Sequence, residues 1–177
     1  MNLEILREKA EKVKWFVFDV DGVLTDGKIV YDSEGRELKH FCVKDGIGIH
    51  MLNLSGFKTA IITGRNSEIV NKRAMELKIT EVFQNSSNKL DHYNFLKEKY
   101  SLKDEEILYI GDDVVDIPVL KRAGFPVTVP SAPKEVKNFA LYITSKKGGN
   151  GAVREVIDLV LKLQNKYDHI IKRFFDI

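Results

Sequence analysis

The chain has 177 residues, 44% of them hydrophobic, and its 28 basic and 26 acidic residues give a formal net charge of +2. This length predicts one domain, residues 1–177, with apolar residues for a sizeable core. The balanced charge excludes the one-sided basic surface of a nucleic-acid binder, and no apolar run reaches the roughly 18–20 residues that span a membrane. The single cysteine, Cys42, excludes an internal disulfide. Together with an N-terminal segment that lacks a signal-peptide apolar core, it predicts a cytoplasmic protein.

Apolar segments typical of buried strands alternate along the chain with amphipathic segments typical of helices. Strands are expected at residues 15–20, 59–63, 81–83, 107–110, 126–129 and 141–144. Helices are expected at about residues 45–55, 67–77, 89–99, 113–122, 133–139 and 151–165. This alternation predicts an α/β fold, a doubly wound (Rossmann-like) parallel sheet with helices on both faces.

Two segments depart from this alternation. Residues 28–41 contain two short strand-like runs around the turn Asp32-Ser33-Glu34-Gly35, which predicts a β-hairpin inserted after the first strand. Residues 166–177 form a C-terminal tail with two adjacent phenylalanines. Large apolar side chains of this kind are expected to pack against another surface rather than stay exposed to solvent. Two interpretations of the tail stay open. In one, the apolar residues Ile170, Ile171, Phe174 and Phe175 cover the site of a neighbouring subunit; in the other, the tail is a helix that packs on its own domain or a frayed chain end.

Polar and acidic residues end three of the predicted strands. They are Asp19, Asp21, Thr63, Gly64, Asp112 and Asp113. Ligands of doubly wound sheets bind at the carboxyl ends of the strands, where these residues converge. Crowded carboxylates repel one another unless a hard cation joins them, and Mg²⁺ prefers oxygen ligands. A phosphate oxygen could complete the octahedral coordination of such an ion. Lys89, which opens a predicted helix, can add a positive charge to such a site.

Simpler interpretations exist for several of these residues. A lone aspartate after a strand is usually a turn former or a helix cap. Asp116 either orients Lys89 and Asp112 or merely occupies the first turn of a helix, where the helix dipole favours it. Cys42 is more typical of a small packing residue than of a nucleophile. The simplest interpretation of His50 is a satisfied helix residue.

The order of the motifs identifies a family. Asp19-Val20-Asp21-Gly22-Val23 matches the DxDGx signature of haloacid dehalogenase-like phosphatases, and Thr63, Lys89 and Gly111-Asp112-Asp113 match three further motifs in order. The chain resembles this family over nearly all of its length. The segments "KDGIGI", "TGRNSEIVNKRAMEL" and "GGNGAVREV" are most similar to a branch without a large cap domain that hydrolyses eight-carbon sugar acid phosphates for lipopolysaccharide precursors. The resemblance implies a Mg²⁺ cofactor, a sugar acid phosphate substrate and a homotetramer whose hairpins help to enclose the site.

The same resemblance implies residue roles. Asp19 would be the nucleophile that forms an aspartyl-phosphate, and Asp21 the general acid that later acts as a base. Thr63 and Lys89 would hold the transferring phosphoryl group. The metal ligands would be Asp19, Asp21 and Asp112, supported by Asp113 and Asp116. The substrate-binding residues would be Asp21, Cys42, Val43, Lys44, Asp45, Gly46, His50, Gly64, Arg65, Arg73 and Lys89.

Two rival functions are kept beside this prediction. The first is a phosphatase of a nine-carbon sugar acid phosphate; in one such branch a glutamate follows "TG", where this chain has Arg65. Arg65 therefore favours the eight-carbon substrate, because the guanidinium fork suits a carboxylate. The second is a non-catalytic sugar-phosphate sensor or assembly domain. The presence of both Asp19 and Asp21 argues against it, since a pure binding module needs no nucleophile.

Overall fold

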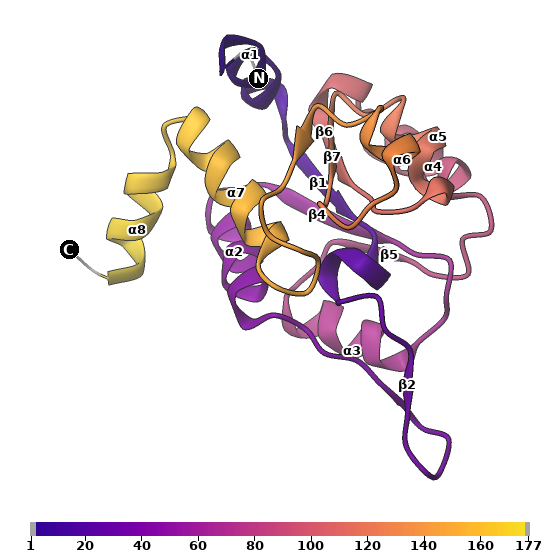
Figure 1. Cartoon of the computed structure of the whole chain (residues 1–177). Coiled ribbons are helices and arrows are strands. Elements are labelled where there is room, and N and C mark those ends of the chain that lie inside the picture. Colours follow the sequence, from indigo (N-terminus) through magenta and orange to yellow (C-terminus); the bar gives the residue numbers. More distant parts are fainter. Residues whose placement is uncertain (1–2, 176–177) are drawn as a thin grey trace.

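A computed structural model describes residues 3–175 of the chain, with side chains described for residues 3–173. Within this part, one sheet has the strand order β5-β4-β1-β6-β7-β8, and every neighbouring pair is parallel (Figure 1). The strands are β1 (Trp15–Phe18), β4 (Lys58–Ile62), β5 (Glu81–Phe83), β6 (Ile107–Ile110), β7 (Phe125–Thr128) and β8 (Tyr142–Ile143). The predicted doubly wound fold is confirmed.

The winding of the sheet reverses beside its central strand. After β1 the chain adds β4 and β5 on one side, then crosses back to add β6, β7 and β8 on the other. A crevice forms at the carboxyl ends of the strands at such a switch point. Asp19 follows β1 and Asp112 follows β6, so the topology brings these two loops to the same crevice.

Helices cover both faces of the sheet, and the alternation of β1 divides the core between them. Phe16 and Phe18 belong to one hydrophobic cluster, and Trp15 and Val17 to the other. Burial on both faces explains why this strand is apolar throughout. The first cluster is completed by residues of α1 (Leu3–Lys12), α2 (Val43–Leu54), α3 (Glu68–Glu76), α7 (Ala152–Leu163) and α8 (Tyr167–Phe175). The second is completed by residues of α4 (Lys89–Tyr100), α5 (Ile117–Leu120) and α6 (Lys134–Lys137).

The helix predicted at 113–122 is broken into two short pieces. A 3₁₀ turn, Val114–Asp116, precedes α5. The carboxylate of Asp113 accepts a hydrogen bond from the backbone N–H of Val114 at 2.7 Å, and Asp116 turns back onto the loop that precedes it. These side-chain bonds replace the first helical turn. The segment predicted at 133–139 is likewise shorter, since α6 spans Lys134–Lys137.

The inserted hairpin is present and projects from the sheet (Figure 1). Its strands β2 (Val30–Tyr31) and β3 (Glu37–Leu38) pair antiparallel. The carboxylate of Asp32 accepts hydrogen bonds from the backbone N–H groups of Glu34 and Arg36, each at 2.9 Å, which fixes the turn. Among the described residues no larger insertion is present, so the fold has no large cap.

The tail forms α8, which packs against α7 at the end of the molecule far from the hairpin (Figure 1). Ile170 is 2% exposed and belongs to the first core cluster, with Ile171 packed against it. Arg173 donates to the carbonyl of Leu54 at 3.2 Å. Residues 167–173 therefore follow the interpretation in which the tail packs on its own domain, while the side chains of Phe174 and Phe175 lie outside the described residues.

None of the helices in the described part of the chain is long and apolar enough to cross a membrane.

Candidate active site

The first aspartate of the signature lies directly after β1. The backbone N–H of Asp19 continues the sheet by donating to the carbonyl of Ile110 at 3.0 Å, and the residue is 5% exposed. The turn Val20–Leu24 follows, with Gly22 at φ +90°, a conformation that side chains rarely allow. A Cβ atom at Gly22 would collide with the carboxylate of Asp112. Glycine is thus required here for the loops after β1 and β6 to meet.

A pair of glycines, Gly148 and Gly149, packs against the turn Val20–Leu24. A Cβ atom at Gly148 would collide with the carbonyl oxygen of Gly22, and the N–H of Gly149 donates to the carbonyl of Val23 at 3.0 Å. The loop that leads into α7 therefore packs on the turn backbone to backbone. From α2, the Asp45 carboxylate accepts a bond from the N–H of Arg154 at 2.7 Å and caps the first turn of α7.

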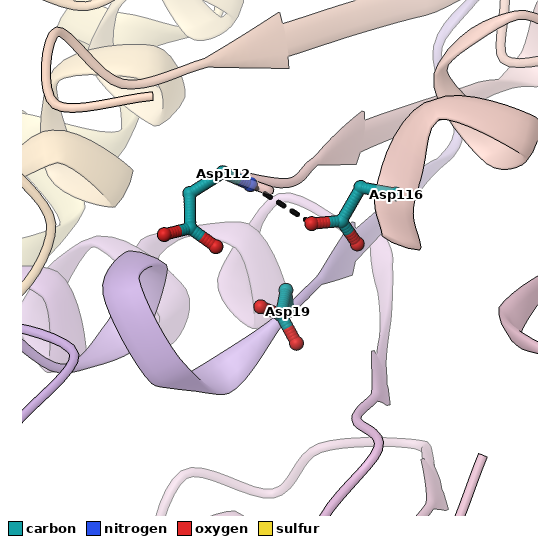
Figure 2. Close-up of side chains that lie close together, drawn as sticks. All are labelled: Asp19, Asp112 and Asp116. Atoms are coloured by element: carbon teal, nitrogen blue, oxygen red, sulfur yellow. Dashed lines mark hydrogen bonds between the residues drawn. The ribbon is translucent and has the colours of Figure 1, made fainter. Parts of the chain in front are cut away.

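Three carboxylates gather at the crevice, from Asp19, Asp112 and Asp116 (Figure 2). One ligand atom from each lies within 4.8 Å of the others. The Nζ of Lys89, at the start of α4, lies 2.8 Å from Asp19 and 2.6 Å from Asp116. When all three carboxylates are ionised, they and the single ammonium leave two negative charges, all carried by oxygen atoms. This donor set fits a hard divalent cation such as Mg²⁺.

Asp116 is fully buried, and hydrogen bonds occupy both of its oxygens. Oδ1 accepts from Lys89 and from the hydroxyl of Tyr109, each at 2.6 Å. Oδ2 accepts from the backbone N–H groups of Asp112 at 2.9 Å (Figure 2) and Asp113 at 3.1 Å. Asp116 therefore positions Lys89 and the loop after β6, and leaves Asp19 and Asp112 to face a cation.

Burial and repulsion oppose ionisation of the two facing carboxylates. Burial, reinforced by the nearby charge of Asp116, raises the pKa of Asp19 to about 8 and that of Asp112 to about 6. Burial alone would lower the pKa of Lys89, but the charges of Asp19 and Asp116 outweigh it and raise that pKa. Lys89 thus stays charged, and a cation bound between the two carboxylates would favour their ionised forms.

A cleft of about 310 Å³ opens above these carboxylates. It is lined by Asp19, Asp21, Gly27, Thr63, Gly64, Arg65, Ser86, Ser87, Lys89, Asp112, Asp113 and Val115. Thr63 follows β4, while Ser86 and Ser87 lie between β5 and α4, so hydroxyl and backbone donors face the carboxylates across the cleft. The cleft can therefore hold a small anion such as a phosphate beside a cation.

The hairpin contributes two residues that the sequence analysis missed. The Nζ of Lys39 lies 2.5 Å from Oδ1 of Asp21, and Glu37 pairs with Arg65 at 3.0 Å. Arg65 also lies 3.9 Å from Asp21. In the sequence, the alternation "ELK" indicates that Glu37 and Lys39, two positions apart, lie on one face of the hairpin. The residues that they contact, Asp21 and Arg65, could not be identified without the fold.

The remaining predicted substrate residues lie on α2 and α3, outside this cleft. Val43, Gly46, His50 and Arg73 line a separate cavity of about 390 Å³ that shares no residue with the cleft. Cys42, Lys44 and Asp45 belong to the same segment. Arg73 pairs with Glu76 at 3.0 Å, and its guanidinium occupies the space that a Cβ atom at Gly46 would fill. Within one chain, none of these residues therefore lines the cleft around Asp19.

This chain is similar to known proteins in both sequence and fold. The haloacid dehalogenase-like hydrolase family matches residues 59–157. The 3-deoxy-D-manno-octulosonate 8-phosphate phosphatase of Escherichia coli K12 is 44% identical over 160 residues, which cover 90% of this chain and 85% of the relative.

Solved structures agree with this similarity. The 3-deoxy-D-manno-octulosonate 8-phosphate phosphatase of Moraxella catarrhalis, in complex with magnesium ion, phosphate ion and the sugar acid KDO, superposes with a TM-score of 0.95 at 45% identity, over 98% of this chain and 99% of that chain. The cobalt-bound deoxy-D-mannose-octulosonate 8-phosphate phosphatase of Haemophilus influenzae gives 0.86 at 39% identity, over 90% of this chain and 93% of that chain. The chain thus belongs to the haloacid dehalogenase-like hydrolases, in the branch that contains the 3-deoxy-D-manno-octulosonate 8-phosphate phosphatases.

Proposed function

We propose that this chain is a Mg²⁺-dependent phosphatase that hydrolyses 3-deoxy-D-manno-octulosonate 8-phosphate to the free sugar acid and phosphate, in the synthesis of lipopolysaccharide precursors. The observation that carries the proposal is the buried carboxylate of Asp19, 2.8 Å from Lys89 and beside Asp112 at the floor of the cleft. The relatives supply the identity of the substrate, and the cleft supplies the chemistry.

The reaction divides into two steps at Asp19. Its carboxylate attacks phosphorus while the bond from phosphorus to the sugar oxygen breaks, and Asp21 gives that oxygen a proton. Water then cleaves the aspartyl-phosphate, with Asp21 taking the proton from the water. Thr63 and Lys89 hold the phosphoryl oxygens throughout. Both carboxylates are needed because phosphate monoester hydrolysis requires accelerations of up to ~10²¹, whereas general acid–base catalysis supplies only about 10²–10⁴.

The metal would be held by Asp19, Asp112 and the backbone carbonyl of Asp21. When bound, Mg²⁺ supplies positive charge that allows an anionic phosphate to approach two carboxylates. The support for this assignment is the oxygen-only donor set and its two excess negative charges. Asp116 supports the metal shell through the backbone of Asp112, and Asp113 caps the turn at the rim.

The sugar would be bound partly by a second copy of the chain. We propose a homotetramer in which the α2–α3 face of one subunit, with residues 42–46, His50 and Arg73, adjoins the cleft of another. The separation of the two cavities within one chain supports this arrangement, as does the exposure of the apolar side chains of Val43 at 75% and Ile47 at 42%. Gly64 and Arg65 would bind substrate from within the same chain's cleft.

We further propose that residues 1–177 act as one phosphatase domain in the cytoplasm. The two core clusters share one sheet, which supports a single unit. The lone cysteine, Cys42, is consistent with a reducing compartment.

The proposal is tested by measuring phosphate release from a panel of sugar phosphates, with Mg²⁺ and with excess chelator. We expect the highest kcat/KM for the eight-carbon sugar acid phosphate, and no release of phosphate from any substrate in excess chelator. Preference for a nine-carbon acid phosphate would replace the substrate but keep the mechanism. Binding of sugar phosphates without release of phosphate would contradict the enzyme and favour a sensor domain.

A further inference from the structure

Lys39 lies at an unusual place for a lysine. It follows strand β3 of the hairpin, and its side chain is only 1% exposed. Lysines are almost never fully buried unless they are paired. The pairing here is with the second aspartate of the signature, since Nζ lies 2.5 Å from Oδ1 of Asp21. A second carboxylate, from Glu37, lies 3.4 Å away.

Glu37 joins this pair to the body of the protein. Its Oε1 accepts from Arg65 at 3.0 Å, and its Oε2 accepts from the hydroxyl of Ser67 at 2.6 Å. Ser67 is the residue that precedes α3. The end of the hairpin is thereby fixed to the loop after β4, although an isolated two-stranded hairpin is only marginally stable.

The alternation of the strand explains why both charged residues point to the site. Glu37 and Lys39 are two positions apart and therefore lie on the same face, while Leu38 between them faces the other way and is 45% exposed. A register shift of one residue would remove both charges from the site and turn Leu38 toward it. The contact with Asp21 is therefore built into the register of the hairpin.

We propose that Lys39 is a positioning residue for the phosphatase reaction, because it holds Oδ1 of Asp21 and leaves Oδ2 to carry the proton. This inference rests on the function proposed above. Lys39 donates to Oδ1, which leaves Oδ2, the oxygen 3.9 Å from Nε of Arg65 at the cleft, as the oxygen available for proton transfer. As the bond from phosphorus to the sugar oxygen breaks and the bond to Asp19 forms, this proton moves from Oδ2 to the sugar oxygen. In the second step Oδ2 receives a proton from the attacking water.

A positioning role has a signature that a merely structural role lacks. A sugar alkoxide is a poor leaving group and needs the proton, whereas p-nitrophenolate leaves without one. Because kcat/KM covers the steps up to departure of the leaving group, displacement of the Asp21 carboxyl should lower kcat/KM for the sugar acid phosphate and spare kcat/KM for p-nitrophenyl phosphate. Loss of folding or of phosphate binding would slow both reactions alike.

The experiment compares Lys39→Met with wild type in Mg²⁺, by kcat/KM for 3-deoxy-D-manno-octulosonate 8-phosphate and for p-nitrophenyl phosphate. We expect a loss of about 10²-fold for the sugar substrate and less than about threefold for the aryl substrate. Lys39→Arg keeps a cationic donor and should recover most of the sugar activity. Asp21→Asn, the benchmark, should show the same selectivity with a larger loss.

The matched control is Lys28→Met, on the same hairpin. Its side chain is 75% exposed and pairs with Asp26, so both activities should stay at wild-type values. If Lys39→Met and Lys39→Arg slow both substrates equally, or neither, the positioning role is overturned while the phosphatase stands. If wild type hydrolyses neither substrate, the proposed function falls, and this inference falls with it.

Discussion

The cleft over β1, β4 and β6 and the face formed by α2 and α3 differ in how complete they are within one chain. In the cleft, Lys89 pairs with both Asp19 and Asp116. Asp116 in turn accepts a hydrogen bond from the backbone of Asp112, so one network within the chain holds these residues together. On the α2–α3 face, Arg73 pairs with Glu76 and lies over the ring of Phe41, and none of the residues assigned to the phosphoryl chemistry lines its cavity of about 390 Å³. Under the proposed function, a single chain supplies the groups for phosphoryl transfer, whereas a second copy of the chain would complete the recognition of the sugar.

The largest expected effect concerns the cleft alone. Asp19→Asn should lower phosphate release by at least about 10³-fold, because an amide is a poor nucleophile and a weaker metal ligand. Stability should not fall with activity, because burial raises the pKa of Asp19 and so penalises its charge. Parallel steady-state kinetics and thermal melting of the metal-free protein would measure both quantities.

The control for this variant is Asp168→Asn, which removes an exposed carboxylate from α8 and should change neither quantity. An Asp19→Asn protein that kept a tenth of wild-type turnover would rule out the aspartyl-phosphate.

An intermediate effect should appear as a pH dependence of stability without metal. Asp19 ionises near 3.8 in the unfolded chain but has a pKa of about 8 in the fold, so the folded state holds the extra proton in between. The free energy of unfolding should therefore fall as the pH rises between about pH 6 and pH 8. Chemical denaturation of chelator-treated protein at several pH values would measure the slope.

Added Mg²⁺ should remove most of this slope, since a cation favours the ionised carboxylates and binds only the folded state. Asp19→Asn should remove it as well. A metal-free protein whose stability stayed flat or rose over this range would show that the cluster is not under the electrostatic strain described above.

The smallest expected effect concerns the α2–α3 face. Arg73→Ala should raise KM for the sugar acid phosphate by about tenfold, because the carboxylate of the sugar acid loses its guanidinium partner. It should leave kcat/KM for p-nitrophenyl phosphate, which has no such carboxylate, unchanged. Arg122→Ala, an exposed arginine beyond α5, serves as the control.

A mixing experiment sharpens the comparison of the two regions. Oligomers reassembled from Asp19→Asn chains and Arg73→Ala chains should contain some sites with an intact Asp19 and a partner's intact Arg73. Such mixtures should recover low-KM activity that neither variant has alone. No recovery in a demonstrated mixed oligomer, or a monomer by light scattering, would defeat the proposal that subunits share the site.

What could be predicted from the sequence follows from distance along the chain and from topology. The strand pattern predicted the sheet, and strand ends of a doubly wound sheet meet at a known edge, so Asp19, Thr63 and Asp112 could be placed together before the fold was known. Asp116 could not be settled, because only the fold reveals that four donors occupy its carboxylate.

The missed residues have a different cause. Lys39 and Glu37 of the hairpin contact Asp21 and Arg65, which lie in loops after other strands. No periodicity in the sequence indicates such a contact. The substrate residues on α2 were carried over from the family motif, which records the residue types a site uses but not which copy of the chain supplies them. Asp45 illustrates the ambiguity, since within one chain it caps α7.

The contact between Gly22 and Gly148 has a consequence for how this sequence can change over time. A Cβ atom at Gly148 would meet backbone atoms of Gly22, and no substitution at Gly22 removes those atoms. Most packed pairs can drift together, one residue growing as its neighbour shrinks, but this pair has no second solution. A recombination that replaced the segment around Gly148 but kept the turn Val20–Leu24 would therefore have to bring in a loop with glycine at the same place.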